Sequence, residues 1–211
     1  MTEAHVENTG DDNPPPRVGE QRPGGRATRV RNAVLQATID LVSEVGYDEA
    51  TIDGIAARAE VHKTTIYRRW STKSALVAAA ASAASDAEIP IPDTGSLAGD
   101  LQALARSVAV NLGSNGGGRR SRSIVASAIA SDQLADDMRD FWAERFQLAS
   151  AVVERAVERG ELQADVDPGL LIETLIGPLW IRLLLTGGPI TAEVADDVAA
   201  MVAAGATTAY G

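Results

Sequence analysis

The segment from Thr51 to Lys73, TIDGIAARAEVHKTTIYRRWSTK, constrains the fold of this chain more than any other. In its first half the apolar residues recur at i, i+3, i+4 and i+7, which places them on one face of a helix. These residues are Ile52, Ile55, Ala56 and Ala59. In its second half Ile66 and Trp70 are four residues apart, so a second short helix can dock on the first. The pattern predicts two helices joined by a tight turn at Glu60 and Val61.

The ends and faces of these two helices carry further information. Thr51 can cap the first helix, and Asp53 in its first turn suits the helix dipole. Once Ile66 and Trp70 face inward, the second helix presents basic and hydroxyl side chains and no acid on its open face. These are Lys63, Thr64, Thr65, Tyr67 and Arg68. Such a face suits a helix that enters the major groove of DNA.

Together with the preceding helix, this segment resembles the DNA-binding half of a TetR-family transcriptional regulator. The similarity runs through TRVRNAVLQATIDLVSEVGYDEAT (residues 28–51) and IAARAEVHKTTIYRRWSTKSAL (residues 55–76). The resemblance implies an all-α homodimer of about nine helices per chain. Its N-terminal three-helix domain would bind operator DNA, and its C-terminal helical domain would bind a small-molecule effector and dimerise.

Two residues depart from the family pattern in the turn. Family members commonly have glycine where this chain has Glu60. A glutamate fits there only if its backbone avoids a positive φ or accepts some strain. The small hydroxyl residue that usually caps the recognition helix is replaced by His62. We expect His62 to cap less well, while its imidazole can reach a phosphate or a base edge.

The charge distribution reconciles an acidic chain with a nucleic-acid partner. The net charge is −10, but residues 26–73 net +2 and residues 74–211 net −9. Residues 61–73 contain four basic groups and no acid. At cellular salt, charge attraction is screened over about 8 Å, so this local patch matters more for phosphates than the distant acidic body. The basic cluster Arg119–Arg122 is interpreted as a solvated helix start.

The chain divides into three regions. Residues 1–25, with DDNPPP and RPGG, read as a disordered tail, either inert or an arm whose Arg22, Arg26 or Arg29 enters a minor groove. Residues 26–73 form the DNA-binding domain, and residues 74–211 the helical ligand-binding and dimerisation domain. Helices are expected at about 28–45, 72–85, 96–111, 119–130, 133–159, 168–185 and 191–207, besides the two short ones. Ser71 is expected to cap the fourth helix, and SNGGG (residues 114–118) to form a flexible loop.

The residues predicted to contact DNA lie on the second short helix and around it. They are Arg29, Thr51, His62, Lys63, Thr64, Thr65, Tyr67, Arg68 and Lys73. Lys73 is included because its ammonium and the amides of the first turn of its helix can together hold one phosphate. That helix joins the two halves, so we expect it to transmit ligand binding to DNA.

The segment 168–185, GLLIETLIGPLWIRLLL with its preceding proline, is apolar nearly all round. Either it is an internal core helix, or part of it faces a second subunit together with the last helix. The predicted dimer residues are Leu175, Leu179, Leu183, Val194, Val198, Met201 and Val202. Glu173, Pro178 and Arg182 interrupt the segment, so a membrane span is not expected. Pro178 should kink this helix.

Apolar and aromatic residues of the C-terminal half either line a ligand cavity or form ordinary core. The predicted lining is Leu104, Val108, Met138, Trp142, Phe146, Ile176 and Trp180. Arg106 and Arg182 lie in apolar helices, where they can hold an anionic ligand group or form a salt bridge with an acid such as Glu173.

The leading functional hypothesis is a cytoplasmic, ligand-responsive repressor that binds a palindromic operator as a homodimer. The alternative is a helical interaction module without a DNA role, against which the intact run from Lys63 to Arg69 argues. An enzyme is disfavoured because the chain has no cysteine and two histidines, His5 and His62. No cofactor, metal site or membrane partner is expected.

Overall fold

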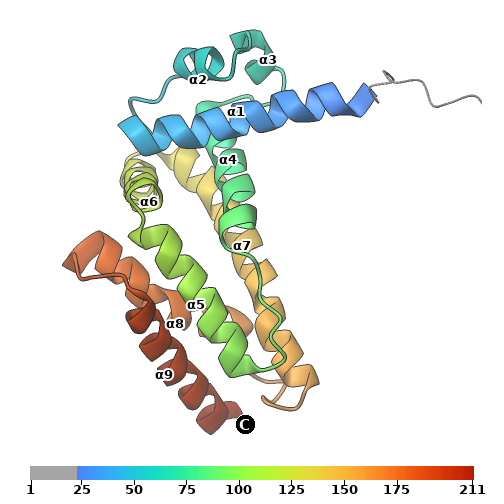
Figure 1. Ribbon diagram of the computed structural model, residues 1–211, viewed down its shortest axis with the longest axis vertical. Helices are drawn as coiled ribbons and strands as arrows, with labels where there is room; N and C mark the ends of the chain where they lie inside the picture. Colours follow the sequence, from blue (N-terminus) through green and yellow to red (C-terminus); the bar gives the residue numbers. More distant parts are fainter. Residues whose placement is uncertain (1–22) are drawn as a thin grey trace, which may run out of the picture.

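The computed structural model describes residues 23–211, and every regular element in that range is helical (Figure 1). The elements are α1 (Pro23–Val45), α2 (Ile52–Arg58), α3 (Lys63–Tyr67), α4 (Lys73–Glu88), α5 (Leu97–Gly113), α6 (Asn115–Ile129), α7 (Asp132–Glu158), α8 (Pro168–Ile181), the π-helical turn η1 (Arg182–Thr186) and α9 (Ala192–Tyr210). The all-α fold class is confirmed. The tail was predicted to cover residues 1–25: residues 1–22, with Arg22, lie outside the described residues, whereas residues 23–25 belong to α1, so the prediction was wrong for them.

Side-chain caps fix the starts of the helices around the turn. The Thr51 hydroxyl accepts a hydrogen bond from the backbone N–H of Gly54 (3.1 Å), which is the predicted cap of α2. The expectation that Ser71 caps α4 was wrong. The cap is Thr72, whose hydroxyl accepts from the backbone N–H of Ala75 (3.0 Å). Both residues can cap a helix, so residue type alone did not choose between them.

α1 is longer at its start than the apolar pattern indicated. It begins at Pro23 rather than near Thr28. Proline suits the first turn of a helix because its φ is already helical and its missing N–H would have no partner there. The helix ends as expected at Gly46, whose φ of +88° is a conformation that glycine adopts without strain.

The first three helices and the beginning of α4 share one small core (Figure 1). Ile55 of α2, Ile66 of α3 and Leu76 of α4 are fully buried and meet Val34 and Leu35 of α1. α2 and α3 are short, so they contribute only two and one buried side chains, respectively, to this core. The spacing read from the sequence is enough to orient them, because each helix has one apolar face.

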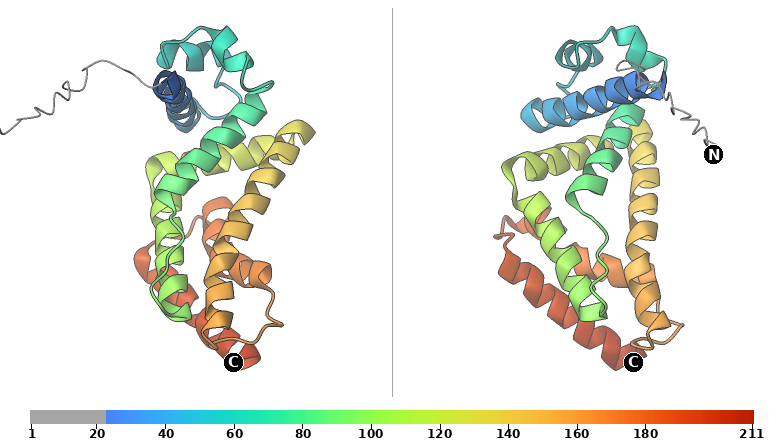
Figure 2. Two further views of the ribbon diagram at one scale, coloured as in Figure 1. Left: turned by 90° about the vertical axis from the view of Figure 1, so that its right-hand side faces the viewer. Right: turned by 45° about the vertical axis from the view of Figure 1, so that its right-hand side comes forward.

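α4 leads from this core into the C-terminal domain (Figure 2). Leu76 packs with α1–α3, whereas the next residue, Val77, packs in a second cluster. That cluster includes Val42 of α1, Ile124 of α6 and Phe141 of α7. A shift of α4 therefore has to change packing in both halves of the molecule.

α5 to α9 form the C-terminal domain. α6 runs across one end of α5 and α7, and α8 and α9 pack on the other side of α5 (Figure 2). The core of this domain is aliphatic, with Leu101, Val152, Leu175 and Leu179 all fully buried. With Val198 of α9, aliphatic side chains from four helices thus fill the part of the domain farthest from the DNA-binding unit.

The glycine tract forms the first turn of α6, so the expected flexible loop was wrong. Ser114 ends α5 and caps α6, and its hydroxyl accepts from the backbone N–H of Gly117 (2.9 Å). A Cβ atom at Gly118 would lie 2.5 Å from the carbonyl oxygen of Leu112. The missing side chains let α6 begin directly against the end of α5, a packing reason that composition did not reveal.

α8 contains Pro178, which removes one backbone donor from the helix. The irregularity in the structure follows it: residues Arg182–Thr186 wind into the π-helical turn η1. This turn is closed by the hydrogen bond from the N–H of Gly187 to the carbonyl of Arg182 (2.9 Å).

Candidate DNA-binding surface and ligand cavity

The turn between α2 and α3 is left-handed at Glu60. Its φ of +54° is the only positive φ of a residue other than glycine within residues 23–211. The turn is closed by the bond from the N–H of Val61 to the carbonyl of Ala56 (3.0 Å). A side chain in this region costs about 1–2 kcal/mol. Of the two possibilities that the sequence left open for Glu60, the structure shows the strained one.

This turn leaves α3 with one buried residue and an open face. Ile66 is 0% exposed, while Tyr67 keeps 53% of its surface exposed. Six of the predicted DNA contacts lie on α3 or beside it, and the structure brings them to the same end of the molecule (Figure 1). The exposed ones are His62, Lys63, Thr64, Tyr67 and Arg68, and Thr65 is half-buried. His62 makes no side-chain cap bond, as its chemistry suggested.

Lys63 is held only weakly. Its ammonium lies 3.2 Å from a carboxylate oxygen of Asp53 on α2, and both side chains are largely exposed. An exposed ion pair of this kind contributes about 0–1 kcal/mol. Lys63 can therefore leave Asp53 for a phosphate at little cost.

Lys73 lies off the open face of α3. Its ammonium donates to the carbonyls of Tyr47 (2.9 Å) and Asp48 (3.3 Å) and lies 4.1 Å from the centre of the Tyr47 ring. Burial lowers the pKa of Lys73, although Asp48 and Glu49 act in the opposite direction. These contacts join the α1–α2 loop to the start of α4.

Two other predicted contacts also have partners inside the domain. The hydroxyl of Thr51 caps α2, and the guanidinium of Arg29 donates to the carbonyl of Gly25 on α1 (3.2 Å). Both residues lie in segments that flank α3, since the neighbours of Arg29 line a cleft with Thr65 and Arg68, and Asp53, two residues after Thr51, pairs with Lys63. A polar residue near a DNA-reading helix can stabilise the domain through hydrogen bonds instead of contacting DNA, and sequence spacing does not distinguish these two roles.

A basic groove lies between the first half of α1 and α3. We use "basic groove" for the cleft lined by Arg26 and Arg31 of α1 and by Arg68 and Arg69 after α3. The ring of Trp70 also lines it, and the Arg69 guanidinium lies 5.8 Å from the ring centre. Arg69 was not among the predicted contacts. The groove places four guanidinium groups next to α3, which suits a phosphate backbone.

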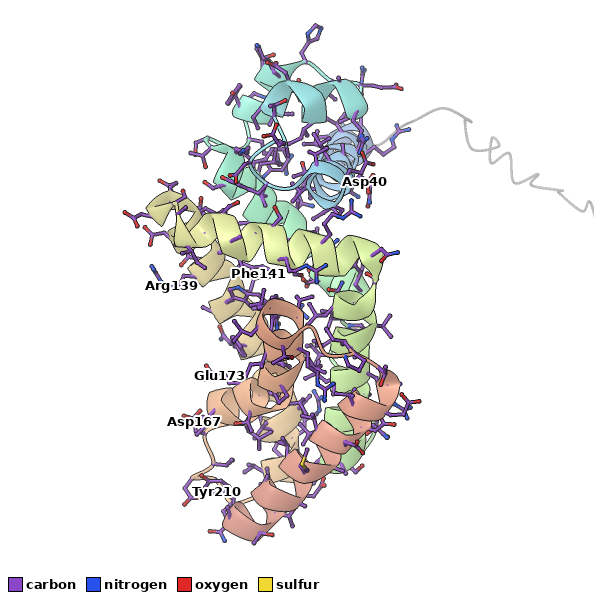
Figure 3. All side chains as sticks on the ribbon, turned by 90° about the vertical axis from the view of Figure 1, so that its left-hand side faces the viewer. Asp40, Arg139, Phe141, Asp167, Glu173 and Tyr210 are labelled. Carbon is purple, nitrogen blue, oxygen red and sulfur yellow. The ribbon has the colours of Figure 1, made fainter. Side chains whose placement is uncertain are left out.

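The C-terminal domain encloses a cavity of about 480 Å³ between the end of α4 and helices α5 to α8. All seven residues predicted to line a ligand cavity line it: Leu104, Val108, Met138, Trp142, Phe146, Ile176 and Trp180. The volume falls within the range of about 300–1,000 Å³ that is usual for small-molecule sites. Phe141, labelled in Figure 3, lines the same cavity from α7.

Trp142 organises the aromatic part of the cavity. Its ring meets Trp180 of α8 edge to face at 5.3 Å between centres, and Phe141 at 4.9 Å. Phe146 completes the group at 6.1 Å from Trp142. These rings form a rigid apolar wall that joins α7 to α8.

The end of the cavity near α4 is polar, which the sequence interpretation missed. Arg120 of α6 and Arg145 of α7 line it, and Arg120 is 8% exposed. Arg120 donates to Glu88 (2.9 Å), and Arg145 donates to Asp86 (3.0 Å) and to the carbonyl of Ile89 (2.8 Å).

The prediction that the Arg119–Arg122 cluster is a solvated helix start was wrong for Arg120. A signal was available in the chain: Gly117, Arg120, Ile124 and Ser127 recur at helical spacing and form the buried stripe of α6. Because α6 was predicted to begin at Arg119, its glycine turn was left out and this stripe was not recognised.

The two arginines proposed from sequence have other partners. Arg106 donates to Asp196 of α9 through two nitrogens (2.6 and 2.7 Å), and both side chains are at the surface. Arg182 donates to the carbonyl of Pro189 (2.8 Å). The predicted alternative of a salt bridge with an acid is thus confirmed for Arg106, with Asp196 in place of Glu173, which is labelled in Figure 3 and exposed on α8. Neither arginine lines the cavity.

Two protein-family models match the chain. One, bacterial regulatory proteins of the tetR family, matches residues 34–80, and the other, the tetracyclin repressor-like C-terminal domain, matches residues 91–202. The chain belongs to the TetR family. The members of this family to which it is similar are transcription regulators, so it is a DNA-binding regulator and not an enzyme.

Individual TetR-family proteins align over most of their length. The DNA-binding transcriptional repressor TetR of Mycobacteroides abscessus is 35% identical over 175 residues, which cover 79% of this chain and 90% of the relative. The regulator AqdR of Rhodococcus erythropolis is 32% identical over 190 residues, which cover 90% of this chain and 91% of the relative. Among solved structures, the TetR-family regulator SCO0332 has a TM-score of 0.73 at 29% identity and covers 84% of this chain and 98% of its own.

Four of the residues predicted for a TetR-type dimer interface are buried inside the chain itself. Leu175, Leu179 and Leu183 of α8 and η1 and Val198 of α9 belong to the C-terminal core, so that prediction was wrong for them. Val194 and Val202 are half-buried against the same core, and Met201 is 66% exposed. Because α8 is apolar on every side, its periodicity did not distinguish the inward from the outward face.

The outward face of α8 and η1 is still apolar. The exposed large apolar residues are Leu170, Ile181, Leu184 and Leu185, and Glu173, Thr174 and Thr186 are exposed on the same segment. By length and composition, Pro168–Thr186 is apolar enough to cross a membrane, and 28% of its most apolar window is buried. One such segment is weak evidence for a span, because core helices of soluble proteins meet the same criterion. Its inward face packs on α5, α7 and α9.

Proposed function

We propose that the protein is a cytoplasmic, ligand-responsive repressor. It binds a palindromic operator as a homodimer and is released when a small-molecule effector enters the cavity. The observation that carries this proposal is the exposed polar face of α3 beside the basic groove, which α4 links to a largely apolar cavity that is open to solvent on one side. The acidic remainder of the chain keeps other surfaces from attracting DNA.

On the operator, α3 would enter the major groove. Thr64, Thr65 and Tyr67 would contact base edges, thymine methyl groups or phosphates. The basic groove and Lys63 would supply positive charge to the backbone on either side, and His62 would add a contact at the start of α3. Lys73, Thr51 and Arg29 would hold the backbone around this surface through the hydrogen bonds described above.

The homodimer would form through the outward face of α8, η1 and α9. This dimer face consists of Leu170, Ile181, Leu184, Leu185 and Met201. A Cβ atom at Gly177 or Gly205 would meet nothing within 4 Å, so a partner helix can approach closely there. Two-fold symmetry would then present α3 twice, to half-sites about 34–36 Å apart.

The cavity supports release by a ligand. The regulator FadR of Bacillus subtilis, solved in complex with stearoyl-CoA, shares the fold with a TM-score of 0.64 at 13% identity. In the present chain α4 contacts both the DNA-binding core and the cavity wall. A hundredfold loss of operator affinity needs about 2.7 kcal/mol of differential ligand binding between the two states. A modest displacement of α4 is sufficient for that.

The test is a mobility-shift titration with DNA from upstream of the protein's own gene, with light scattering to measure mass. We expect a sequence-specific shift that weakens steeply with salt, and a dimer in solution. Binding that ignores sequence, or none at low salt, would contradict the DNA role and favour an interaction module. A monomer at micromolar concentration, or a dimer that survives Leu185→Asp, would contradict the proposed interface.

A further inference from the structure

The polar end of the cavity indicates which ligands it accepts. We propose that Arg120 and Arg145 form an anion subsite for the acidic group of an amphipathic organic acid, and that this acid competes with Glu88 and Asp86 for the two arginines. The proposal rests on the proposed ligand response. It adds the chemical class of the effector and the point at which it acts on α4.

The rest of the cavity is suited to an apolar body. Trp142, Phe146 and Trp180 form one wall, and Leu104 and Ile176 complete it from α5 and α8. These side chains offer area for burial and little hydrogen bonding. A ligand that fills this volume therefore has an apolar body, and its charged group has to lie where the wall becomes polar.

The two arginines at that end require an anion. Arg120 is 8% exposed, and 11% of the Arg145 side chain is exposed. A buried guanidinium without a counter-ion is strongly unfavourable. Each arginine has five N–H donors, and the described contacts of Arg120 use one nitrogen, towards Glu88. A ligand carboxylate can bind a guanidinium through two parallel hydrogen bonds, which is the stronger arrangement.

The carboxylates that now pair with the two arginines are placed so that a ligand anion can replace them. The side chain of Glu88 is 41% exposed and that of Asp86 is 62% exposed, so both carboxylates lie near the rim. They can return to water without being left buried, whereas the arginines remain inside. An entering acid thus replaces a protein anion by a ligand anion and leaves no buried charge unpaired.

This exchange changes what holds α4. The last turn of α4 is held by Arg120 and Asn111 through Glu88, and by Arg145 through Asp86 and the carbonyl of Ile89. An acid that takes over the arginines removes the bonds from Arg120 to Glu88 and from Arg145 to Asp86, and leaves the bond from Asn111. The other end of α4 stays fixed to the DNA-binding domain through buried Leu76 and through Lys73. The release therefore acts on the helix that sets the position of α3.

The first experiment compares acids with neutral analogues on the full-length protein without DNA. Calorimetry would use decanoate against decanol and 2-naphthoate against 2-naphthalenemethanol, to cover two body shapes. We expect at least one acid to bind more than tenfold tighter than its alcohol. Arg120→Gln should reduce that preference to below threefold and leave binding of the alcohol unchanged. Arg122→Gln is the matched control and should leave the preference unchanged, because Arg122 is exposed on the same helix and does not line the cavity.

Equal binding of acid and alcohol, or no binding of either acid, would overturn the anion subsite. The competition is tested separately with Glu88→Gln, which removes the charge and keeps the shape. This variant should bind the acid severalfold tighter than the wild type, whereas Glu144→Gln, an exposed change on α7, should not. Unchanged or weaker binding by Glu88→Gln, with an unaltered circular dichroism spectrum, would show that Glu88 does not compete.

Operator release is measured apart from binding, so the two proposals can fail independently. If acids bind with the expected preference but leave the operator complex intact, the ligand response proposed above fails and the anion subsite stands. If only neutral molecules release the operator, the ligand response stands and the anion subsite fails.

Discussion

The DNA-binding unit and the cavity domain use the same element, the helix, in opposite ways. α3 has five residues, of which only Ile66 is buried, so almost all of its side chains are available to a partner. α7 has 27 residues and turns its aromatic side chains inward with those of α8. The residues of the DNA-binding surface on α3 lie in one short stretch of sequence. The cavity exists only after α4 to α8 have packed, and this difference decides how the two regions respond to change.

Core substitutions should separate the two regions most strongly. We expect Ile66→Ala and Leu175→Ala each to lower the free energy of unfolding by about 2–5 kcal/mol, because both side chains are fully buried. Ile66→Ala should speed amide hydrogen exchange mainly in α1–α3, and Leu175→Ala mainly in α5, α8 and α9. Uniform acceleration across the chain by both variants would mean that the regions unfold as one unit.

Surface substitutions on α3 should change binding and leave stability alone. We expect Tyr67→Ala to weaken operator binding by about 1–3 kcal/mol. Lys63→Ala should reduce the slope of the logarithm of the binding constant against the logarithm of the salt concentration by about 0.9 in magnitude. Neither should shift the melting temperature, because both side chains are exposed.

Lys73→Ala tests, by contrast, a basic residue whose bonds lie within the DNA-binding domain. The Lys73 ammonium bonds the carbonyls of Tyr47 and Asp48, so its loss should lower the melting temperature of the DNA-binding unit. If the melting temperature is unchanged and operator affinity depends less steeply on salt concentration, Lys73 contacts a phosphate, as predicted from the sequence.

The same contrast explains what the sequence could predict. The helix-turn-helix could be predicted because its apolar residues lie within one segment and the residue that caps α2 directly precedes that helix. The apolar residues are Ile52, Ile55, Ile66 and Trp70. The lining of the cavity was also found, since Trp142 and Phe146 share a helix face and Trp180 follows on the next helix. The inward face of α8 was not found, because a helix that is apolar all round carries no periodic signal.

The polar end of the cavity could not be predicted for a different reason. The bond between Arg120 and Glu88 joins residues 32 positions apart, and Arg145 and Asp86 are 59 apart. Periodicity indicates which face of a helix is buried, but not which distant acid will meet it. Lys73 shows the same limit at short range, since its partners are backbone carbonyls that any sequence would offer.

The turn at Glu60 offers a smaller test within the DNA-binding unit. We expect Glu60→Gly to raise the free energy of unfolding by about 0.5–1 kcal/mol, because relief of the left-handed strain exceeds the added flexibility of glycine. Glu60→Ala keeps a side chain at a φ of +54° and should bring no gain. Denaturant titrations of the three proteins decide this, and a stabilised alanine variant would show that the charge of Glu60, not its backbone, is the unfavourable feature.

The smallest expected effect concerns the surface link between α5 and α9. The hydrogen bonds from Arg106 hold the pKa of Asp196 below its ordinary value of 3.8, although desolvation acts the other way. A lowered folded pKa contributes stability at pH values above the unfolded pKa, and this contribution is lost as the pH falls through the folded pKa. Asp196→Asn should therefore lower the melting temperature slightly at pH 6 and flatten its fall below pH 4, while Asp197→Asn, at its exposed neighbour, should not. Since the pair is at the surface and screened by salt, the difference should shrink in 0.5 M NaCl, whereas a difference that persists there would indicate a packing role for Asp196.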